Sequence, residues 1–237
     1  MAAAPPELSA IVLCFAAGQG ITRITEPLLE QLREAEIDFE LVLVANRLSG
    51  DGDPTSEVVE ELGAKYPEVV PVLREKQGGM GWDMRSGFDA ARGRTLVVID
   101  GDTQNPVGDV LRMYREMHRT GAEVMKGRRI ARFDGPYRRA QSFVFNAAFR
   151  VLFGTQGLWD MNGKPKGLTR AAYERITIKS DYWFADAEMM IKAQRMGMEI
   201  AEMPVIFRQN ADRASLVRPS AIWEFVVAML KARIGRY

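Results

Sequence analysis

The sequence has very little of the residue types that disulfides, zinc sites and histidine-based catalysis require. Its 237 residues include one cysteine, Cys14, and one histidine, His118. A lone cysteine excludes an internal disulfide, and without a cysteine and histidine cluster there is no structural zinc site. A serine–histidine–aspartate triad would have to use His118, which we expect on the surface near the end of a helix.

Long apolar runs and an excess of one charge are also missing. No apolar run approaches the roughly 18 residues of a membrane-spanning helix, and residues 1–6 lack the features of a secretory signal. With 32 Lys and Arg against 31 Asp and Glu, the net charge is +1, which disfavours a nucleic-acid partner. We expect a cytoplasmic protein, either free or peripheral on the cytoplasmic face of a membrane.

Short apolar runs typical of buried strands recur through the first half, separated by helical patterns. The runs are residues 11–15, 41–44, 69–73 and 96–99, and the helices are 22–35, 54–66 and 80–91. This alternation predicts an α/β fold with a mostly parallel central sheet flanked by helices. Pro71 in the third run predicts an edge strand or a bulge.

The second half is less regular. It predicts helices at 106–119, 136–153, 185–196 and 220–234, and strands at 122–126 and 199–207. Pro204 places the last strand near an edge of the sheet, and residues 154–167 are predicted as loop and turn. Because no linker rich in Gly, Ser or Pro interrupts the chain, we expect a single domain.

Two carboxylates, Asp100 and Asp102, stand directly after the fourth apolar run. Ligands of open parallel sheets bind beyond the carboxyl ends of the strands. Two close carboxylates repel each other unless a cation or hydrogen bonds compensate. Mg²⁺ or Mn²⁺ suits this pair because hard cations share oxygen ligands with substrate phosphates, and Gln104 can add a neutral oxygen. The alternative is a polar turn that ends the strand.

An ordered set of motifs resembles the family 2 glycosyltransferases of GT-A fold, above all the dolichol-phosphate mannosyltransferases and related polyprenyl-phosphate glycosyltransferases. The motifs cover residues 10–216. They are Gly79-Met80-Gly81, Gly87, Ala91, Gly93, residues 100–106, Gly127-Arg128, Arg139, Ser142, Asn146, Asp160, Phe184, Asp186, Glu188, residues 202–205, Phe207 and Ser215.

This resemblance implies a metal-dependent, inverting transfer of a sugar from a nucleotide sugar to a polyprenyl phosphate. It divides the single domain, 1–237, into a nucleotide-sugar-binding half (10–105), an acceptor half (106–216) and an amphipathic helix (220–237). It assigns the metal, Mg²⁺ or Mn²⁺, to Asp100, Asp102 and Gln104. It assigns donor contacts to Ala16, Ala17, Gly18, Asn46, Gly79, Gly81, Asp100, Gly101 and Asp102.

The chain departs from the family at two places. Asn46 stands where the family usually has two acidic residues, one of which contacts the base, so the base and the sugar stay open. After Phe207, Asn210 replaces the usual Arg, and either Arg213 or Arg208 restores that charge.

Residues 126–150 carry a formal charge of +6. A segment this basic favours an anionic ligand, because Arg binds phosphate as a fork, although Arg132 and Arg150 fit a solvated helix face better. By resemblance, the acceptor phosphate meets Lys126, Arg128, Arg139, Ser142 and Arg213. A phosphate monoester has its second pKa near 6 and needs no histidine base.

Catalytic roles are expected for Asp102, Arg139 and Asp186. The alternative for Asp186 is a carboxylate stabilised at a helix N-terminus. The loop 162–167 is cationic and turn-forming; it either binds donor phosphate or is solvated. We expect Lys164 to be solvated and leave Lys166 open.

The final helix joins an apolar face, Trp223 and terminal cations. It fits a helix that lies in a membrane interface, which we favour, or a helix packed on the domain.

Three other functions stay open at this point. Residues 16–23 resemble the glycine-rich signature of sugar-nucleotidyltransferases, but those enzymes place a Lys soon after the Arg, and the first Lys here is Lys65. A family 2 transferase that acts on a sugar or protein hydroxyl would need Asp186 as base. A binding protein that kept the fold would not need the intact Asp100, Asp102 and Gln104.

Overall fold

The structure, a computed structural model, describes residues 4–48, 50, 52–132, 136–154, 158–208 and 220–234. For residues 132, 136–141 and 220–224 it describes the backbone alone. The strands are β1 (Leu8–Leu13), β2 (Phe39–Val44), β3 (Val69–Val72), β4 (Thr95–Asp100), β5 (Val124–Arg132), β6 (Lys166–Thr169) and β7 (Ile200–Phe207). The helices are η1 (Gly18–Ile21), α1 (Thr22–Glu34), α2 (Thr55–Lys65), α3 (Met80–Ala90), α4 (Gly108–Thr120), α5 (Pro136–Phe153), α6 (Arg170–Ile176), α7 (Ala185–Arg195) and α8 (Ser220–Arg233).

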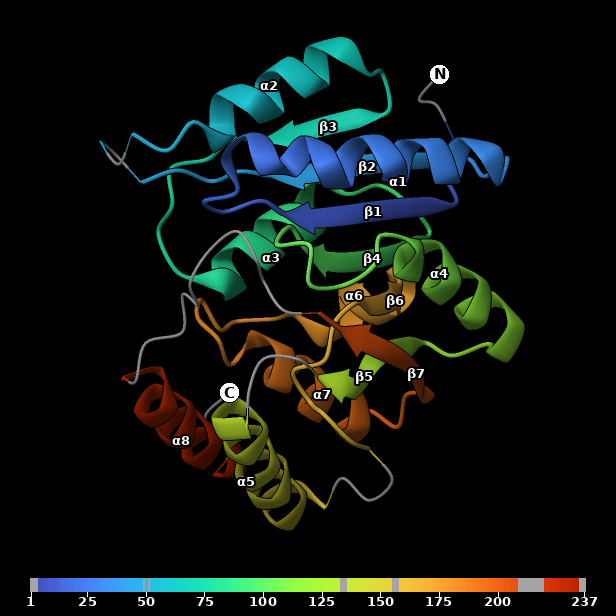
Figure 1. Ribbon diagram of the computed structural model, residues 1–237. Coiled ribbons are helices and arrows are strands. Elements are labelled where there is room, and N and C mark those ends of the chain that lie inside the picture. The colour runs from blue at the N-terminus through green and yellow to red at the C-terminus, as the bar shows by residue number, and fades with distance from the viewer. Residues whose placement is uncertain are drawn as a thin grey trace.

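The strands form one sheet in the order β3-β2-β1-β4-β6-β5-β7 (Figure 1). Strand β6 runs antiparallel to both of its neighbours, β4 and β5, and every other neighbouring pair is parallel. The predicted α/β fold with a mostly parallel sheet is therefore confirmed.

Helices cover both faces of this sheet, because its central strands are apolar on both sides. All six residues of β1 are buried. Helices η1, α1, α2 and α4 contribute to the apolar cluster on one face. Helices α3, α5, α6, α7 and α8 contribute to the cluster on the other face, and α5 and α8 lie together at one end of the molecule (Figure 1).

Both proline-based predictions are confirmed. Strand β3, which contains Pro71, and strand β7, which contains Pro204, are the two edges of the sheet. His118 is exposed in the last turn of α4, as expected. The prediction that residues 154–167 are loop and turn misses the start of β6 at Lys166. Helix α6, which directly follows β6, was not predicted either.

Helix α8 packs on the domain through one face. The ring of Phe225 lies edge-on to Phe145 of α5 and to Phe184, and Ala228, Met229 and Ala232 are buried. On the opposite face Leu230 and Ile234 are exposed. The packing interpretation is thus confirmed for one face; Trp223 lies outside the described side chains. None of the described helices is long and apolar enough to cross a membrane.

Candidate active site

The carboxyl ends of β1, β2 and β4 meet at one edge of the sheet, since these strands are parallel neighbours. Three non-glycine residues in the loops around this edge have left-handed backbones: Ala16 after β1 (φ 53°), Thr103 after β4 (φ 63°) and Asp160 (φ 55°). Such conformations are costly for residues with a Cβ and concentrate at functional sites. The loops after β1 and β4, which the sequence predicted to contact the donor and the metal, therefore contain strained backbone conformations.

An ion pair between Asp100 and Lys164 lies at the centre of this edge. The antiparallel register pairs Val98 of β4 with Lys166 of β6, so two residues further along it brings Lys164 opposite Asp100. The ammonium of Lys164 lies 2.7 Å from Asp100 Oδ1 and 3.8 Å from Asp186 Oδ2. Burial acts to lower the pKa of Lys164, but Asp100 and Asp186 outweigh it and hold that pKa well above its ordinary value.

The expectation that Lys164 is solvated is therefore wrong. Lys164 is only 5% exposed, and Lys166 is fully buried. Lys166 begins β6, which lies between β4 and β5, and Lys164 lies in the turn that leads into this strand. Sequence reasoning missed the role of Lys164 because a Lys-Pro-Lys turn has the composition of a surface loop.

Lys166 is fixed from several sides. Its ammonium donates to the carbonyls of Met161 (2.8 Å) and Gly163 (2.9 Å) and lies 3.2 Å from Asp186 Oδ1. Burial lowers the pKa of Lys166 to about 8. Asp186, in the first turn of α7, is also buried, and within the described structure its Oδ1 accepts no hydrogen bond.

The described charges at this site do not balance: three carboxylates face two ammonium groups, which leaves one excess negative charge. The carboxylates of Asp100, Asp102 and Asp186 all act on the ammonium of Lys164, and Lys166 adds the second cation. Among the described residues, no three His, Cys, Asp or Glu side chains converge to form a complete metal cage. The pair Asp100 and Asp102 nevertheless fits Mg²⁺ or Mn²⁺, which commonly takes one or two carboxylates and completes its shell with phosphate and water.

Gln104, the third expected metal ligand, is engaged with the chain itself. Its Nε2 donates to the carbonyl of Arg208 (3.0 Å), and its backbone N–H donates to Asp102 Oδ1 (3.1 Å). The N–H of Arg208 returns a bond to the Gln104 carbonyl (2.8 Å). Gln104 thus ties the loop after β4 to the end of β7 and orients Asp102.

Asn46, at the end of β2, is held by a carboxylate that the sequence did not single out. Its Nδ2 donates to Asp83 Oδ1 of α3 (3.0 Å), and its Oδ1 accepts the N–H of Arg74 (3.0 Å). Asp83 is buried and also pairs with Lys76, whose ammonium lies over the ring of Phe15. Burial raises the pKa of Asp83 against the effect of Lys76 and Asn46.

The glycines expected to contact the donor allow segments of the chain to approach each other. A Cβ on Gly81 would meet the carbonyls of Ser180 and Tyr182, and one on Gly79 would meet Tyr182. A Cβ on Gly101 would lie 2.7 Å from the Leu13 carbonyl, between the ends of β1 and β4. Gly79 and Gly81 thus allow the N-terminus of α3 to lie against the loop before α7, and Gly101 allows the ends of β1 and β4 to lie close together.

The turn after β1 is anchored to α2. The N–H of Gly18 donates to Thr55 Oγ1 (2.7 Å), and Gly18 adopts a left-handed φ of 51°. Ala17 begins η1 as its N-cap. Ala16, Ala17 and Gly18 therefore lie at the same edge of the sheet as Asp100.

Part of the basic segment is neutralised inside the protein. Lys126 is fully buried and pairs with Glu202, and Arg129 forms a two-pronged ion pair with Asp160, donating from Nε to Oδ2 at 2.6 Å. Burial acts to raise the pKa of Asp160, but Arg129 outweighs it and lowers that pKa. The +6 of the sequence therefore overstates the charge available to a ligand.

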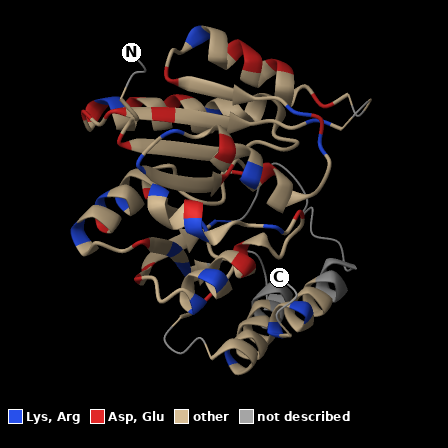
Figure 2. Cartoon of the chain, turned by 180° about the vertical axis from the view of Figure 1, so that it is seen from behind, with Lys and Arg blue, Asp and Glu red and all other residues tan. Residues whose placement is uncertain are grey.

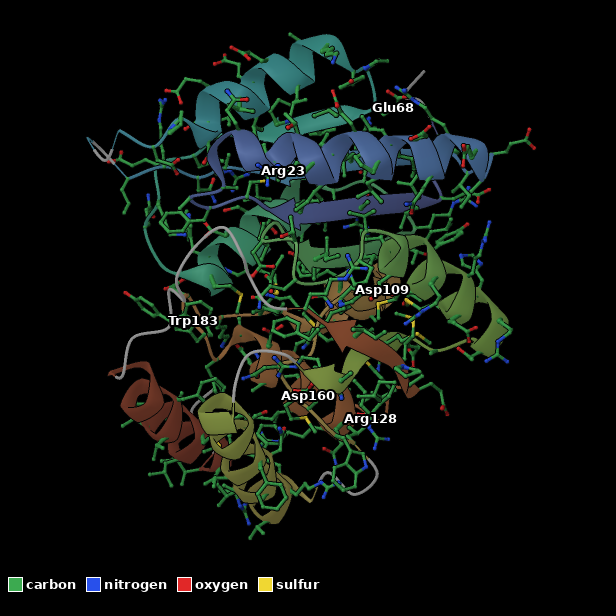
Figure 3. The ribbon with its side chains drawn as sticks, in the orientation of Figure 1. Arg23, Glu68, Asp109, Arg128, Asp160 and Trp183 are labelled. Atoms are coloured by element: carbon green, nitrogen blue, oxygen red, sulfur yellow. The ribbon has the colours of Figure 1, made fainter. Side chains whose placement is uncertain are left out.

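Arg128 remains at the surface. It is labelled near Asp160 in Figure 3, and it shares the exposed ring of Trp159 with Arg150, whose guanidinium lies 3.3 Å from the ring centroid. Ser142 accepts a hydrogen bond from Asn146. The side chains of Arg139 and Arg213 lie outside the described residues. The structure thus brings Asp100, Asp102 and Asp186 together but does not describe the whole expected acceptor set.

Comparison with known proteins identifies the family. The family model described as glycosyl transferase family 2 matches residues 9–177. The chain is 30% identical to the glycosyltransferase AglD of Haloferax volcanii over 84% of its length and 32% of that protein. It is 25% identical to the dolichyl-phosphate beta-glucosyltransferase ALG5A of Trichomonas vaginalis, over 84% of this chain and 64% of the relative. The chain thus spans less than two thirds of these relatives.

A solved structure has the same fold. Glucosyl-3-phosphoglycerate synthase from Mycobacterium tuberculosis, in complex with Mn²⁺, uridine diphosphate and phosphoglyceric acid, matches with a TM-score of 0.73 and 18% identity. The match covers 97% of this chain and 79% of the synthase.

The backbone around Lys164 packs closely against β5 because Gly163 and Gly127 have no Cβ. We therefore predict that Gly163→Ala destabilises the protein. A Cβ on Gly163 would collide with the carbonyl of Gly127 in β5, and a backbone clash of this kind typically costs about 1–3 kcal/mol. Thermal unfolding should show a clearly lower Tm. Gly20→Ala is the control, because a Cβ there meets nothing within 4 Å; equal Tm values for the two variants would contradict this packing.

Proposed function

The chain belongs to glycosyl transferase family 2, and from this we propose that it transfers a sugar from a nucleotide sugar to a polyprenyl phosphate, with inversion and with a divalent metal. The observation that carries the proposal is the pair Asp100 and Asp102 at the end of β4, facing Lys164 and Asp186. Membership of this family argues against the alternative function, that of a sugar-nucleotidyltransferase.

The relatives support the choice of acceptor. One of them is named a dolichyl-phosphate beta-glucosyltransferase, and another, from Photorhabdus laumondii, is named an undecaprenyl-phosphate 4-deoxy-4-formamido-L-arabinose transferase. The second is 24% identical over 60% of this chain and 42% of its own length. Their acceptors share a phosphate on a long isoprenoid chain, which is the class we propose here.

In the donor half, the chain's residues bind and orient the nucleotide sugar. Ala16, Ala17, Gly18, Gly79, Gly81 and Gly101 border the donor, and Asn46 is held rigidly by Asp83 and Arg74. Asp100 and Asp102, the latter oriented by the Gln104 N–H, would hold Mg²⁺ or Mn²⁺. When bound, the metal would neutralise charge on the departing nucleoside diphosphate.

In the acceptor half, the chain's residues position a nucleophile that is already charged. Arg128, Arg139, Ser142 and Arg213 would bind the acceptor phosphate, while the buried Lys126 would support β5 beneath it. Positioning alone supplies much of the rate enhancement when the nucleophile needs no base. Asp186 would keep Lys164 and Lys166 in place beside the donor.

The helices α5 and α8 would place the site at a membrane surface. Phe143, Val144 and Val151 of α5 are exposed, as are Leu230 of α8 and Ile234 directly after it. Helix α5 contains no acidic residue, and Figure 2 shows Lys and Arg on both helices among uncharged residues. Exposed apolar side chains with nearby cations suit the interface of an anionic bilayer, so we propose peripheral binding on the cytoplasmic face.

We predict that Asp102→Ala abolishes sugar transfer and metal-dependent nucleotide binding while the protein stays folded. Removing the carboxylate removes a metal ligand but no core contact. Release of nucleoside diphosphate from a sugar donor, with polyprenyl phosphate as acceptor, measures the reaction. Asp38→Ala, an exposed change at the amino end of β2, is the control. Undiminished transfer by the Asp102 variant would refute the metal mechanism.

We predict that Arg128→Ala raises the KM for polyprenyl phosphate about tenfold to a hundredfold, since a hydrogen bond to a charged group contributes about 1.5–3 kcal/mol. The KM for the nucleotide sugar should change little. Arg119→Ala, which removes an exposed Arg from α4, is the matched control. Equal losses for both substrates would place Arg128 at the donor instead.

We predict that Phe143→Glu weakens flotation of the protein with phosphatidylglycerol vesicles, because a carboxylate on α5 is repelled by an anionic interface. Phe143 is 72% exposed, so the Tm should not fall. Met196→Glu, at the exposed end of α7, is the control. If both variants float like the unaltered protein, α5 does not face the membrane.

A further inference from the structure

Lys164 occupies the position next to Asp100 where the proposed function requires a divalent cation. Its ammonium is 2.7 Å from Asp100 Oδ1, inside hydrogen-bond distance, and only 5% of the residue is exposed. A divalent cation bound to Asp100 would repel this ammonium, because two like charges within a few ångströms of each other raise the free energy even beside a carboxylate that is 32% exposed.

The same ammonium has a second carboxylate within reach. Asp186 Oδ2 is 3.8 Å away, and the other carboxylate oxygen, Oδ1, lies 3.2 Å from the ammonium of Lys166. A lysine side chain has four methylene groups and flexible torsions, so its ammonium can move between two such partners while its backbone stays in place. Asn105 Nδ2 fixes that backbone through a 2.9 Å bond to the Lys164 carbonyl.

We propose that Lys164 is a built-in counter-ion of Asp100 that moves to Asp186 when a divalent cation binds, and that it thereby sets the metal affinity of the site. This proposal rests on one part of the proposed function, namely that Asp100 and Asp102 bind a divalent cation. Lys166 does not take this part, because the carbonyls of Met161 and Gly163 already hold its ammonium.

The exchange connects the two halves of the protein. Asp100 ends β4 in the expected nucleotide-binding half, whereas Asp186 lies in the first turn of α7 in the expected acceptor half. Binding of a cation and nucleotide at Asp100 would strengthen the link between Lys164 and Asp186. A change that favours this second pairing therefore raises the affinity for the cation, by at most the factor by which it raises the population of that pairing.

The test measures Mn²⁺ binding, by electron paramagnetic resonance, to the full chain without substrates. We expect Lys164→Met to bind Mn²⁺ about tenfold to a hundredfold more tightly, since removing one nearby charge in a partly exposed site has an effect of this order. Lys192→Met is the matched control: it removes another partly buried lysine from an ion pair, with Glu188, that does not involve Asp100. Equal Mn²⁺ affinity of the Lys164 variant and the unaltered chain overturns the proposal.

A second variant tests the destination of the ammonium and keeps the proposal falsifiable if Lys164→Met folds poorly. Asp186→Asn should weaken Mn²⁺ binding several-fold, because the displaced ammonium loses its alternative partner. The same change in the Lys164→Met background should weaken Mn²⁺ binding clearly less, because there it removes only a nearby negative charge and no alternative partner of an ammonium. An equal effect of Asp186→Asn in both backgrounds overturns the proposed movement.

The outcomes also separate this inference from the proposed function. If Mn²⁺ binds the unaltered chain with nucleoside diphosphate and sugar transfer occurs, but Lys164→Met changes nothing, the function stands and the inference fails. If Mn²⁺ binds neither the unaltered chain nor Lys164→Met, even with nucleoside diphosphate, both the metal mechanism and the inference are overturned.

Discussion

A charge inside a protein is tolerated only beside an opposite charge, and this constraint shapes the centre of the sheet. Strand β6 lies between β4 and β5, and this strand and the turn before it bury Lys166 and Lys164 respectively. Each ammonium then requires a carboxylate or several carbonyls, which Asp100, Asp186 and the loop 161–163 provide. The positions of β4, β6 and α7 therefore depend on one another, and the candidate site lies where they meet.

The first half of the fold and the carboxylate pair could be predicted because their signals are local. A buried parallel strand is a continuous apolar run, and a strand followed directly by Asp100 and Asp102 points to the edge of the sheet. Strand β6 has no such signal: its four residues, Lys166–Thr169, contain one large apolar side chain, and only the neighbouring strands bury them. The ion pairs of Lys164 depend on register across the sheet, which the composition of a loop does not reveal.

The basic segment shows the same limit in electrostatic terms. Net charge counted along the chain, +6 over residues 126–150, predicts a strong field. In the folded protein, Glu202 lies against Lys126, and Asp160 holds Arg129, although both acids are distant in sequence. Among the side chains of this segment that the structure describes, the cations left at the surface are Arg128 and Arg150, both against the ring of Trp159. The charge counted along the sequence therefore overestimates the charge that this segment presents at the surface, and its role in binding an acceptor stays a prediction.

The prolines at the two edges of the sheet have a consequence for self-association. An edge strand offers unpaired N–H and C=O groups to any other strand, which is how sheets of separate molecules join. Pro71 in β3 and Pro204 in β7 each lack the N–H that such pairing needs. Each edge strand therefore offers one donor fewer to a strand of another molecule, which disfavours growth of the sheet at both ends.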